Sequence, residues 1–229
     1  MRLDKYLAHL QVGSRAAVKQ LIRNKQVTVN AEIVRDPSAA VTEADVVAVA
    51  GQVVAGVLEV TYIMNKPAGV ITATKDANAQ TVLDLIAQTD RRPGLYPVGR
   101  LDKDTTGLLL LTTDGALGHA LLAPKRHVPK QYAVTLDAPL TADMIAELEA
   151  GIAFEDFTSA PAQVVQTAPL AALITIHEGK FHQVKRMFHA VGCEVVTLKR
   201  VAMGALTLPS DLAPGQYRKL TADERGLLP

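Results

Sequence analysis

The stretch GRLDKDTTGLLLLTTDG, from Gly99 to Gly115, places charged side chains directly before four consecutive leucines. The leucines at 108–111 form a short, continuous apolar run of the kind that fills a buried strand. The charged residues before them are Arg100, Asp102, Lys103 and Asp104. Charged side chains are rarely buried unless they are paired or used. The stretch therefore predicts a charged site mounted on a core strand.

The composition indicates a globular protein with an aliphatic core. The chain has 229 residues, of which 48% are hydrophobic, 21% are charged and 4% are aromatic, with no Trp. This length suits one large domain or two smaller ones. The single cysteine, Cys193, excludes a disulfide framework within the chain and fits a reducing cytosol.

The chain shows no signal for membrane insertion. The N-terminal sequence MRLDKYLAHL lacks the apolar segment of a signal peptide, and no apolar run approaches the length that spans a bilayer. We therefore expect a soluble, cytoplasmic protein with no membrane partner.

The net charge is only +1, but the positive charges are concentrated near the N-terminus. Residues 1–30 hold a single acid, Asp4, against six basic residues: Arg2, Lys5, Arg15, Lys19, Arg23 and Lys25. Such a surface suits a polyanion such as nucleic acid. An ordinary solvated helix face explains it equally well, so both interpretations stay open.

The first 56 residues predict a compact unit of two helices and short strands. Apolar residues at helical spacing indicate a helix over 3–10, and Ser14 is a good N-cap for a second one. Short alternating segments at 26–29, 32–34 and 46–49 predict strands. The glycine-containing segment 50–59 is the expected linker. We therefore expect two domains, residues 1–56 and 57–229.

The second domain predicts an α+β fold. Strands are expected at 60–65, 107–112, 131–136, 172–177, 194–198 and 204–208. Helices are expected at 82–88, 116–122, 142–150 and 182–191, with Thr141 capping the third of them. Strands and helices alternate without a regular βαβ period, which favours a mixed or antiparallel β-sheet flanked by helices.

The aspartates around the leucine run allow three interpretations. Asp102, Asp104 and Asp114 supply hard oxygen ligands for Mg²⁺, which would indicate a nuclease or phosphotransferase. Alternatively, one carboxylate is a nucleophile that attacks a sugar carbon, with a cation nearby to keep it ionised. The third interpretation is a turn residue that binds its own backbone, which suits Asp104 better than Asp102.

A second unusual stretch is EGKFHQVKRMFHAVG, residues 178–192. Phe181, Val184 and Phe188 mark an apolar helical stripe, and Lys185 lies at its edge. The lysine either pairs with a carboxylate or phosphate, or is a solvated cation. Tyr132 begins a predicted strand, where it stacks on a base, moves a proton or simply fills a half-buried position.

No cofactor or metal signature is present in the sequence. The histidines near Cys193 fit no common zinc-ligand spacing. The chain has no phosphate-binding P-loop, no dinucleotide fingerprint and no Gly-x-Ser-x-Gly elbow. We therefore expect neither a cofactor nor a metal.

Several stretches together resemble the RsuA branch of the pseudouridine synthases. GRLDKDTTGLLLLTTDG resembles the catalytic motif of that family. The other family-like motifs are NKPAGV at 65–70, KQYAV at 130–134, EGKFHQVKRM at 178–187 and LAPGQYRKLTADE at 212–224. Residues 1 to about 45 resemble the alpha-L RNA-binding module, which a ribosomal small-subunit protein shares. The resemblance implies a small alpha-L domain followed by a larger catalytic domain.

The resemblance also implies roles for individual residues. Asp102 is the expected catalytic aspartate, Tyr132 packs against the target base, and Lys185 pairs with the aspartate. The residues expected to contact RNA are Arg100, Lys103, Arg2, Arg15, Lys19, Arg23, Lys66, His182, Gln183 and Arg186.

The implied reaction converts a specific uridine of RNA into pseudouridine without a cofactor. The run HALLAPKRHVPKQYAV at 119–134 is most similar to family members that modify small-subunit ribosomal RNA. The resemblance thus implies a monomeric enzyme whose partner is 16S small-subunit ribosomal RNA. Large-subunit RNA or tRNA is the alternative substrate. A non-catalytic RNA-binding factor for ribosome assembly is the alternative of another class, and a metal-dependent nuclease is the third option.

Overall fold

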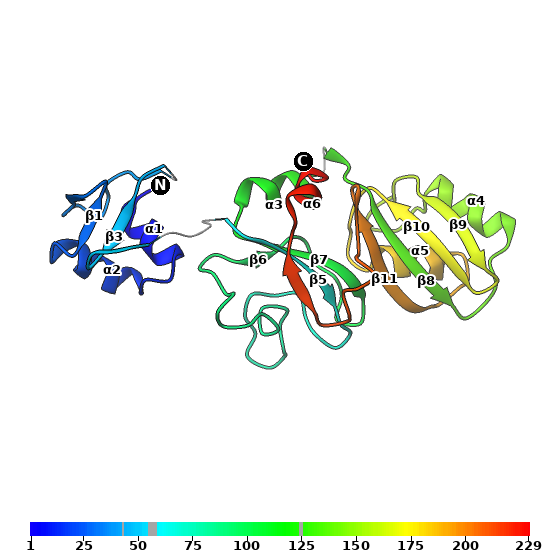
Figure 1. Cartoon of the computed structure of the whole chain (residues 1–229). Coiled ribbons are helices and arrows are strands. Elements are labelled where there is room, and N and C mark those ends of the chain that lie inside the picture. The colour runs from blue at the N-terminus through cyan, green and yellow to red at the C-terminus, as the bar shows by residue number, and fades with distance from the viewer. Residues whose placement is uncertain (43, 55–58, 124–125) are drawn as a thin grey trace. The chain divides into compact units, whose positions relative to one another are not determined.

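The computed structural model describes residues 1–42, 44–54, 59–123 and 126–229, and two compact units emerge from it (Figure 1). The first comprises Met1–Val60 with Asp90–Leu95, and the second comprises Thr61–Thr89 with Tyr96–Pro229. The expected boundary between residues 56 and 57 lies outside the described residues. No helix in the described part of the chain is long and apolar enough to cross a bilayer.

The first unit packs two helices against a small antiparallel sheet. Its elements are α1 (Leu3–His9), α2 (Arg15–Arg23), β1 (Val27–Val29), β2 (Glu32–Ile33), β3 (Val47–Val49) and β4 (Gln52–Val53). The strands lie in the order β2-β1-β3-β4, and each neighbouring pair is antiparallel. Strand β4 lies within the segment expected to be a linker, because Gln52 and Val53 pair with β3 in a hairpin.

Local sequence signals explain this unit. The Ser14 hydroxyl accepts a hydrogen bond from the backbone N–H of Ala17 and so caps α2, as predicted. Between β1 and β2, Asn30 and Ala31 both adopt positive φ angles, which a tight hairpin turn requires. The apolar faces of the helices meet the sheet in a buried cluster that contains Leu3, Leu7, Val18, Ile22, Val27 and Val47.

The second unit is built on one mixed sheet. Its main strands are β5 (Thr61–Lys66), β7 (Thr106–Thr112), β8 (Lys130–Leu136), β9 (Gln163–Ala168), β10 (Ala171–Ile176), β11 (Val195–Met203) and β13 (Tyr217–Lys219). They lie in the order β13-β5-β7-β11-β8-β10-β9. The sheet is mixed because β7 and β11 run parallel. Two short strands, β6 (Tyr96–Pro97) and β12 (Leu206–Thr207), pair with β7 and β11.

Four helices accompany this sheet: α3 (Gly115–Leu122), α4 (Ala142–Ala150), α5 (Gln183–Ala190) and α6 (Ala222–Gly226). Each of the first three contacts a strand: α3 contacts β7, α4 contacts β9 and α5 contacts β11. Thr141 caps α4 as predicted, since its hydroxyl accepts a hydrogen bond from the Met144 N–H. The observed architecture is therefore the expected α+β fold.

The leucine run forms the centre of the sheet. Leu108–Leu111 are fully buried in β7, which lies between β5 and β11. Gly107 precedes them with a φ of +100°, and a Cβ there would lie 2.2 Å from the carbonyl oxygen of Arg200. Only glycine allows β7 to approach β11 this closely, and that approach positions the loop before β7.

The helix expected at 82–88 is wrong, because this segment folds as consecutive turns. The Ile86 N–H donates to the Leu83 carbonyl, which is a turn rather than a helical bond. The Ala87 N–H donates to the Tyr217 hydroxyl at 2.9 Å, so it is not available for the i−4 bond of a helix. A tertiary contact with β13 thus overrides the local helical pattern.

Candidate active site

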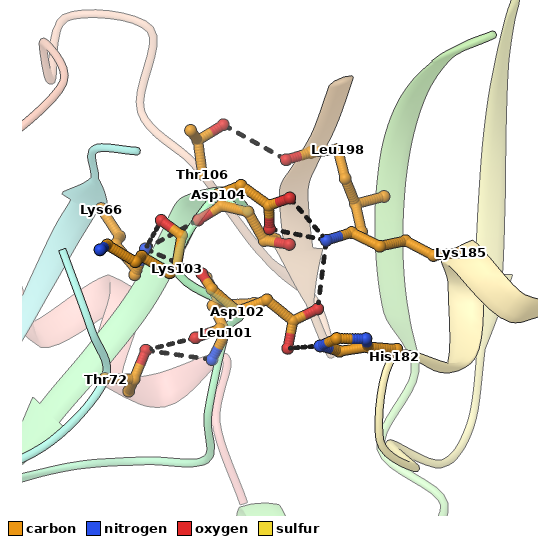
Figure 2. A network of polar contacts seen from close by, with 11 residues as sticks. Lys66, Thr72, Leu101, Asp102, Lys103, Asp104, Thr106, His182, Lys185 and Leu198 are labelled. Carbon is orange, nitrogen blue, oxygen red and sulfur yellow. Dashed lines mark hydrogen bonds and ion pairs between the residues drawn. The ribbon is translucent and has the colours of Figure 1, made fainter. Parts of the chain in front are cut away.

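The loop of residues 102–105 carries Asp102 and is held in place by a buried lysine (Figure 2). Lys66 ends β5 and is fully buried. Its ammonium donates to the backbone carbonyls of Asp102 at 3.0 Å and Thr105 at 2.9 Å, with longer bonds to those of Pro67 and Lys103. The loop is therefore fixed through its backbone, which leaves the side chain of Asp102 free to face outward.

Lys66 is consequently not in a position to contact RNA, which corrects the expectation from the sequence. Burial lowers the pKa of its ammonium to about 8, while the charges of Asp104 and Asp102 act in the opposite direction. Lys66 is 0% exposed and donates hydrogen bonds to four backbone carbonyls, so it stabilises the loop from inside the protein.

A second anchor fixes the residue before Asp102. The hydroxyl of Thr72 donates to the Leu101 carbonyl at 2.7 Å and accepts from the Leu101 N–H at 3.1 Å. Both bonds are buried, where an unpaired backbone group would be costly. Sequence patterns gave no signal for Thr72, because its partner lies in a distant segment.

The carboxylate of Asp102 faces two basic side chains, one from α5 and one from the turn before it. Its Oδ2 lies 3.6 Å from Nζ of Lys185, and its Oδ1 lies 3.7 Å from Nε2 of His182 (Figure 2). Lys185 also contacts both oxygens of Asp104, at 2.6 and 2.8 Å. This hydrogen bond holds the pKa of Asp104 below its usual range. The lysine thus lies between two carboxylates contributed by one loop.

The turn before α5 sets the position of these two side chains. His182 adopts a left-handed conformation, with a φ of 51°, directly before the helix. Gln183 stabilises the turn: its side-chain oxygen accepts from the Lys180 N–H, and its amide donates to Glu178 at 2.7 Å. The Gln183 side chain is therefore engaged within the protein, and its expected role as an RNA contact stays a prediction.

Phe181 is not part of the apolar stripe of this helix, contrary to the prediction. The helix begins only at Gln183, and the Phe181 side chain is 75% exposed. Its ring stacks on the imidazole of His182, with a centroid distance of 3.8 Å. An exposed aromatic ring thus lies on the residue that contacts Asp102.

A small cavity of about 60 Å³ lies at the Asp102 carboxylate. Tyr132 lines it from β8, together with the apolar side chains of Ile176, Val184 and Leu198 and with polar side chains such as His182 and Gln183. Three residues expected to be catalytic, Asp102, Tyr132 and Lys185, are therefore close in space.

The remaining expected RNA contacts of this unit differ in placement. Arg100 lines the cavity, and Lys103 is exposed in the same loop. Arg186 instead makes a bidentate ion pair with Asp156 and lies over the ring of Phe154. Arg186 is therefore not part of the cavity lining, and its expected contact with RNA stays a prediction.

In the first unit, the expected RNA contacts lie mainly on one helix. Arg15, Lys19 and Arg23 are four residues apart on α2, so they share one face of it. Arg2 precedes α1, where it pairs with Asp4 at 3.0 Å.

The aspartates do not converge as a metal site would require. Asp114 caps α3 by accepting a hydrogen bond from the Leu117 N–H, and the cation of Lys185 lies between Asp102 and Asp104. Among the described residues, no three His, Cys, Asp or Glu side chains are grouped to hold a metal ion. The donor set therefore does not fit the nuclease interpretation.

Comparison with known proteins agrees with the fold. Residues 60–190 match the family model of RNA pseudouridylate synthases, and residues 1–47 match that of the S4 domain. A crystal structure described as a pseudouridylate synthase is 33% identical, with a TM-score of 0.70 and complete coverage of both chains.

Curated relatives span nearly the whole chain. The uncharacterized RNA pseudouridine synthase YtzG of Bacillus subtilis is 44% identical over 100% of this chain and 98% of its own. The ribosomal small subunit pseudouridine synthase A of Escherichia coli K12 is 41% identical over 98% of both chains, and that of Yersinia pestis is 40% identical over 98% and 96%.

The chain therefore belongs to the RsuA-type RNA pseudouridine synthases, with an N-terminal S4 domain. It is an isomerase that acts on RNA. The alternative of a non-catalytic assembly factor is accordingly not supported.

Proposed function

We propose that this enzyme isomerises a specific uridine of small-subunit ribosomal RNA in the cytoplasm, with Asp102 as the catalytic carboxylate. Support for the substrate comes from the relatives named for the small ribosomal subunit, which cover nearly the full chain. The observation that carries the catalytic assignment is the placement of Asp102 in the lining of a small cavity, beside Lys185 and His182.

The reaction needs no redox partner, because atoms are only rearranged. The bond between uracil N1 and ribose C1′ breaks, the base turns, and C5 bonds to C1′ while its proton leaves and N1 gains one. An ionised carboxylate acts at C1′, either by direct attack or by assisting elimination. The target uridine must leave its stack to reach the cavity, where Tyr132 supplies an aromatic surface for the base.

The S4 domain supplies a separate grip on the RNA in this proposal. The cations Arg15, Lys19 and Arg23 on one face of α2 suit contacts with successive phosphates. Such contacts position the RNA without reading its sequence.

The experiment that tests the proposal compares two aspartates that share one lysine. Tritium release from C5-labelled uridine in small-subunit ribosomal RNA is measured for the wild type, Asp102→Asn and Asp104→Asn. We expect Asp102→Asn to abolish release with RNA affinity unchanged within a few fold, because only the carboxylate is lost. Asp104→Asn removes the same charge from the same lysine, yet we expect it to retain at least a tenth of the activity.

Each other outcome is informative. Release by Asp102→Asn near the wild-type rate would refute the catalytic assignment. Release from large-subunit RNA or tRNA, but not from small-subunit RNA, would keep the chemistry and change the substrate.

A further inference from the structure

A second, larger cavity of about 310 Å³ adjoins the one at Asp102. Four residues line both cavities: Arg100, Tyr132, Gly179 and Lys180. A strand of RNA whose target base occupies the small cavity therefore has space in the larger one for part of an adjoining nucleotide.

The walls of the larger cavity are strongly cationic. Among the described residues, its lining includes one carboxylate, that of Glu178, against four lysine and arginine side chains: Arg100, Lys130, Lys180 and Arg200. Glu178 is already engaged, since its Oε1 accepts hydrogen bonds from the Ala160 N–H and from the Gln183 amide. Within the part of the lining that the structure describes, the positive charge is therefore not balanced by a free carboxylate.

Arg200 is the most unusual member of this lining. It lies on β11 with only 2% of its surface exposed, and its Nε donates to the Leu108 carbonyl at 2.8 Å. Its Nη2 is buried and has no hydrogen-bond partner among the described residues. A buried donor without an acceptor is costly, and more so on a charged group. The guanidinium therefore lacks one acceptor in the structure without ligand.

Lys130 is a second, partly buried cation of this lining. Its Nζ donates to the Val128 carbonyl at 3.0 Å. Burial lowers its pKa, the positive charge of Arg200 lowers it further, and Glu178 opposes both effects. Two cations that repel each other around one cavity are the arrangement that a bound anion stabilises.

We propose that this cavity is a phosphate subsite, which holds the backbone phosphate of a nucleotide adjoining the target uridine. Arg200 and Lys130 supply charged donors from the cavity wall, and Lys180 supplies an exposed cation. RNA is favoured over a free anion because the cavity shares four lining residues with the one at Asp102. This inference rests on the proposed function, since it presumes that the target base enters the smaller cavity.

The test scans the phosphates of a short RNA from which the wild-type enzyme releases tritium. One linkage at a time next to the target uridine is replaced by an uncharged methylphosphonate, and the Kd is measured. Lys130→Gln and Lys180→Gln are the test variants. Lys199→Gln is the matched control, because Lys199 is exposed beside Arg200 and does not line the cavity. Arg200 is left unchanged, since its loss also removes the bond to Leu108.

We expect one linkage to weaken wild-type binding by about tenfold, the scale of a charge-assisted hydrogen bond. Lys130→Gln should weaken binding to the unmodified RNA similarly, and combining the two changes should cause little further loss. Such a non-additive loss indicates that the side chain and the phosphate are coupled. Lys180→Gln should show weaker coupling to the same linkage, and Lys199→Gln should show none.

Purely additive losses at every linkage, with tritium release intact, would overturn the subsite while leaving the proposed function standing. Titration with inorganic phosphate tests whether the cavity binds a free anion instead of an RNA phosphate. Binding of inorganic phosphate that Lys130→Gln abolishes, without coupling to any RNA linkage, would assign the cavity to a free anion and overturn the proposal. Absence of tritium release from every ribosomal RNA tested would overturn the proposed function, and the subsite with it.

Discussion

Lys185 lies closer to Asp104 than to Asp102. Its Nζ is 2.6 Å from Oδ1 of Asp104 but 3.6 Å from Oδ2 of Asp102. The short bond therefore goes to the exposed carboxylate, and the one at the cavity receives only the longer electrostatic contact. Asp102 thus lies beside a cation while its oxygens keep room for a ligand.

Lys185→Gln should lower kcat for tritium release by about tenfold or more, because a close cation stabilises the ionised carboxylate. The KM should change by only a few fold, and Lys185→Arg should recover part of the loss. Steady-state kinetics on all three proteins check this. A raised KM at unchanged kcat would instead make Lys185 an RNA contact.

Lys66→Met should act on turnover rather than on binding. The methionine fills similar space, but the carbonyls of Asp102 and Thr105 lose their buried donor. We expect kcat to fall by about tenfold or more through misplacement of the loop, because small displacements of a catalytic group are costly. The Kd for RNA should stay within about threefold, as measured by filter binding.

The control for this variant is Lys103→Met, which removes an exposed cation from the same loop. We expect it to weaken RNA binding modestly and to leave kcat nearly unchanged. If Lys66→Met weakened RNA binding at unchanged kcat while Lys103→Met lowered kcat, Lys66 would instead be an RNA contact, as the sequence suggested.

Phe181→Ala should weaken RNA binding without destabilising the protein. An exposed ring adds little to the free energy of unfolding, whereas stacking of a base on an aromatic ring contributes about 1–3 kcal/mol. We therefore expect at least about a fivefold rise in Kd and a thermal midpoint unchanged within a few degrees. Val165→Ala, at another exposed apolar side chain, should leave both unchanged. Equal Kd values for wild type and Phe181→Ala would exclude the ring from the interface.

Glu224 gives a prediction for acid stability. The carboxylate accepts two hydrogen bonds from Arg218 and completes a capping box with Thr221 at α6. The Arg218 hydrogen bonds, foremost, lower the pKa of Glu224 to about 2. Because the folded chain releases this proton more readily than the unfolded chain, the stabilisation is present above about pH 4.5 and is lost as pH falls toward 2.

Glu224→Gln should therefore lower the free energy of unfolding by about 1–3 kcal/mol at pH 7, with a smaller difference at pH 3. Urea unfolding at both pH values measures this. Asp223→Asn changes a neighbouring acid in the same first turn and should cost less than about 1 kcal/mol. A difference that grows toward low pH would contradict the assignment.

The elements that local chemistry determines were predictable from the sequence. The caps at Ser14 and Thr141 and the buried strand of leucines depend on neighbouring residues or on simple apolar runs. The strands predicted at 194–198 and 204–208 proved to be one hairpin, β11 with β12, because pairing with β8 extends β11 to Met203.

The contacts that long-range packing determines were not predictable. Apolar and polar residues alternate only weakly in β9, whose residues are largely exposed, and β13 is only three residues long. Neither strand therefore has a clear apolar pattern in the sequence. Lys66 and Gln183 were expected to contact RNA because a sequence motif shows the type of each residue but not whether its side chain is buried. The structure shows both inside the protein, while Arg200, which the motifs did not single out, lines a cavity.

The parallel pairing of β7 with β11 also constrains how the enzyme is made. It sets Arg200 opposite Gly107, so the central strand of the sheet finds this neighbour only in a much later part of the chain. Synthesis on the ribosome proceeds from the N-terminus, and contacts between distant segments form late. The helices and short strands of residues 1–54 can form as soon as they emerge, whereas Asp102 must wait for Lys185 and β11. A nascent chain therefore holds its S4 module before it holds an assembled catalytic site.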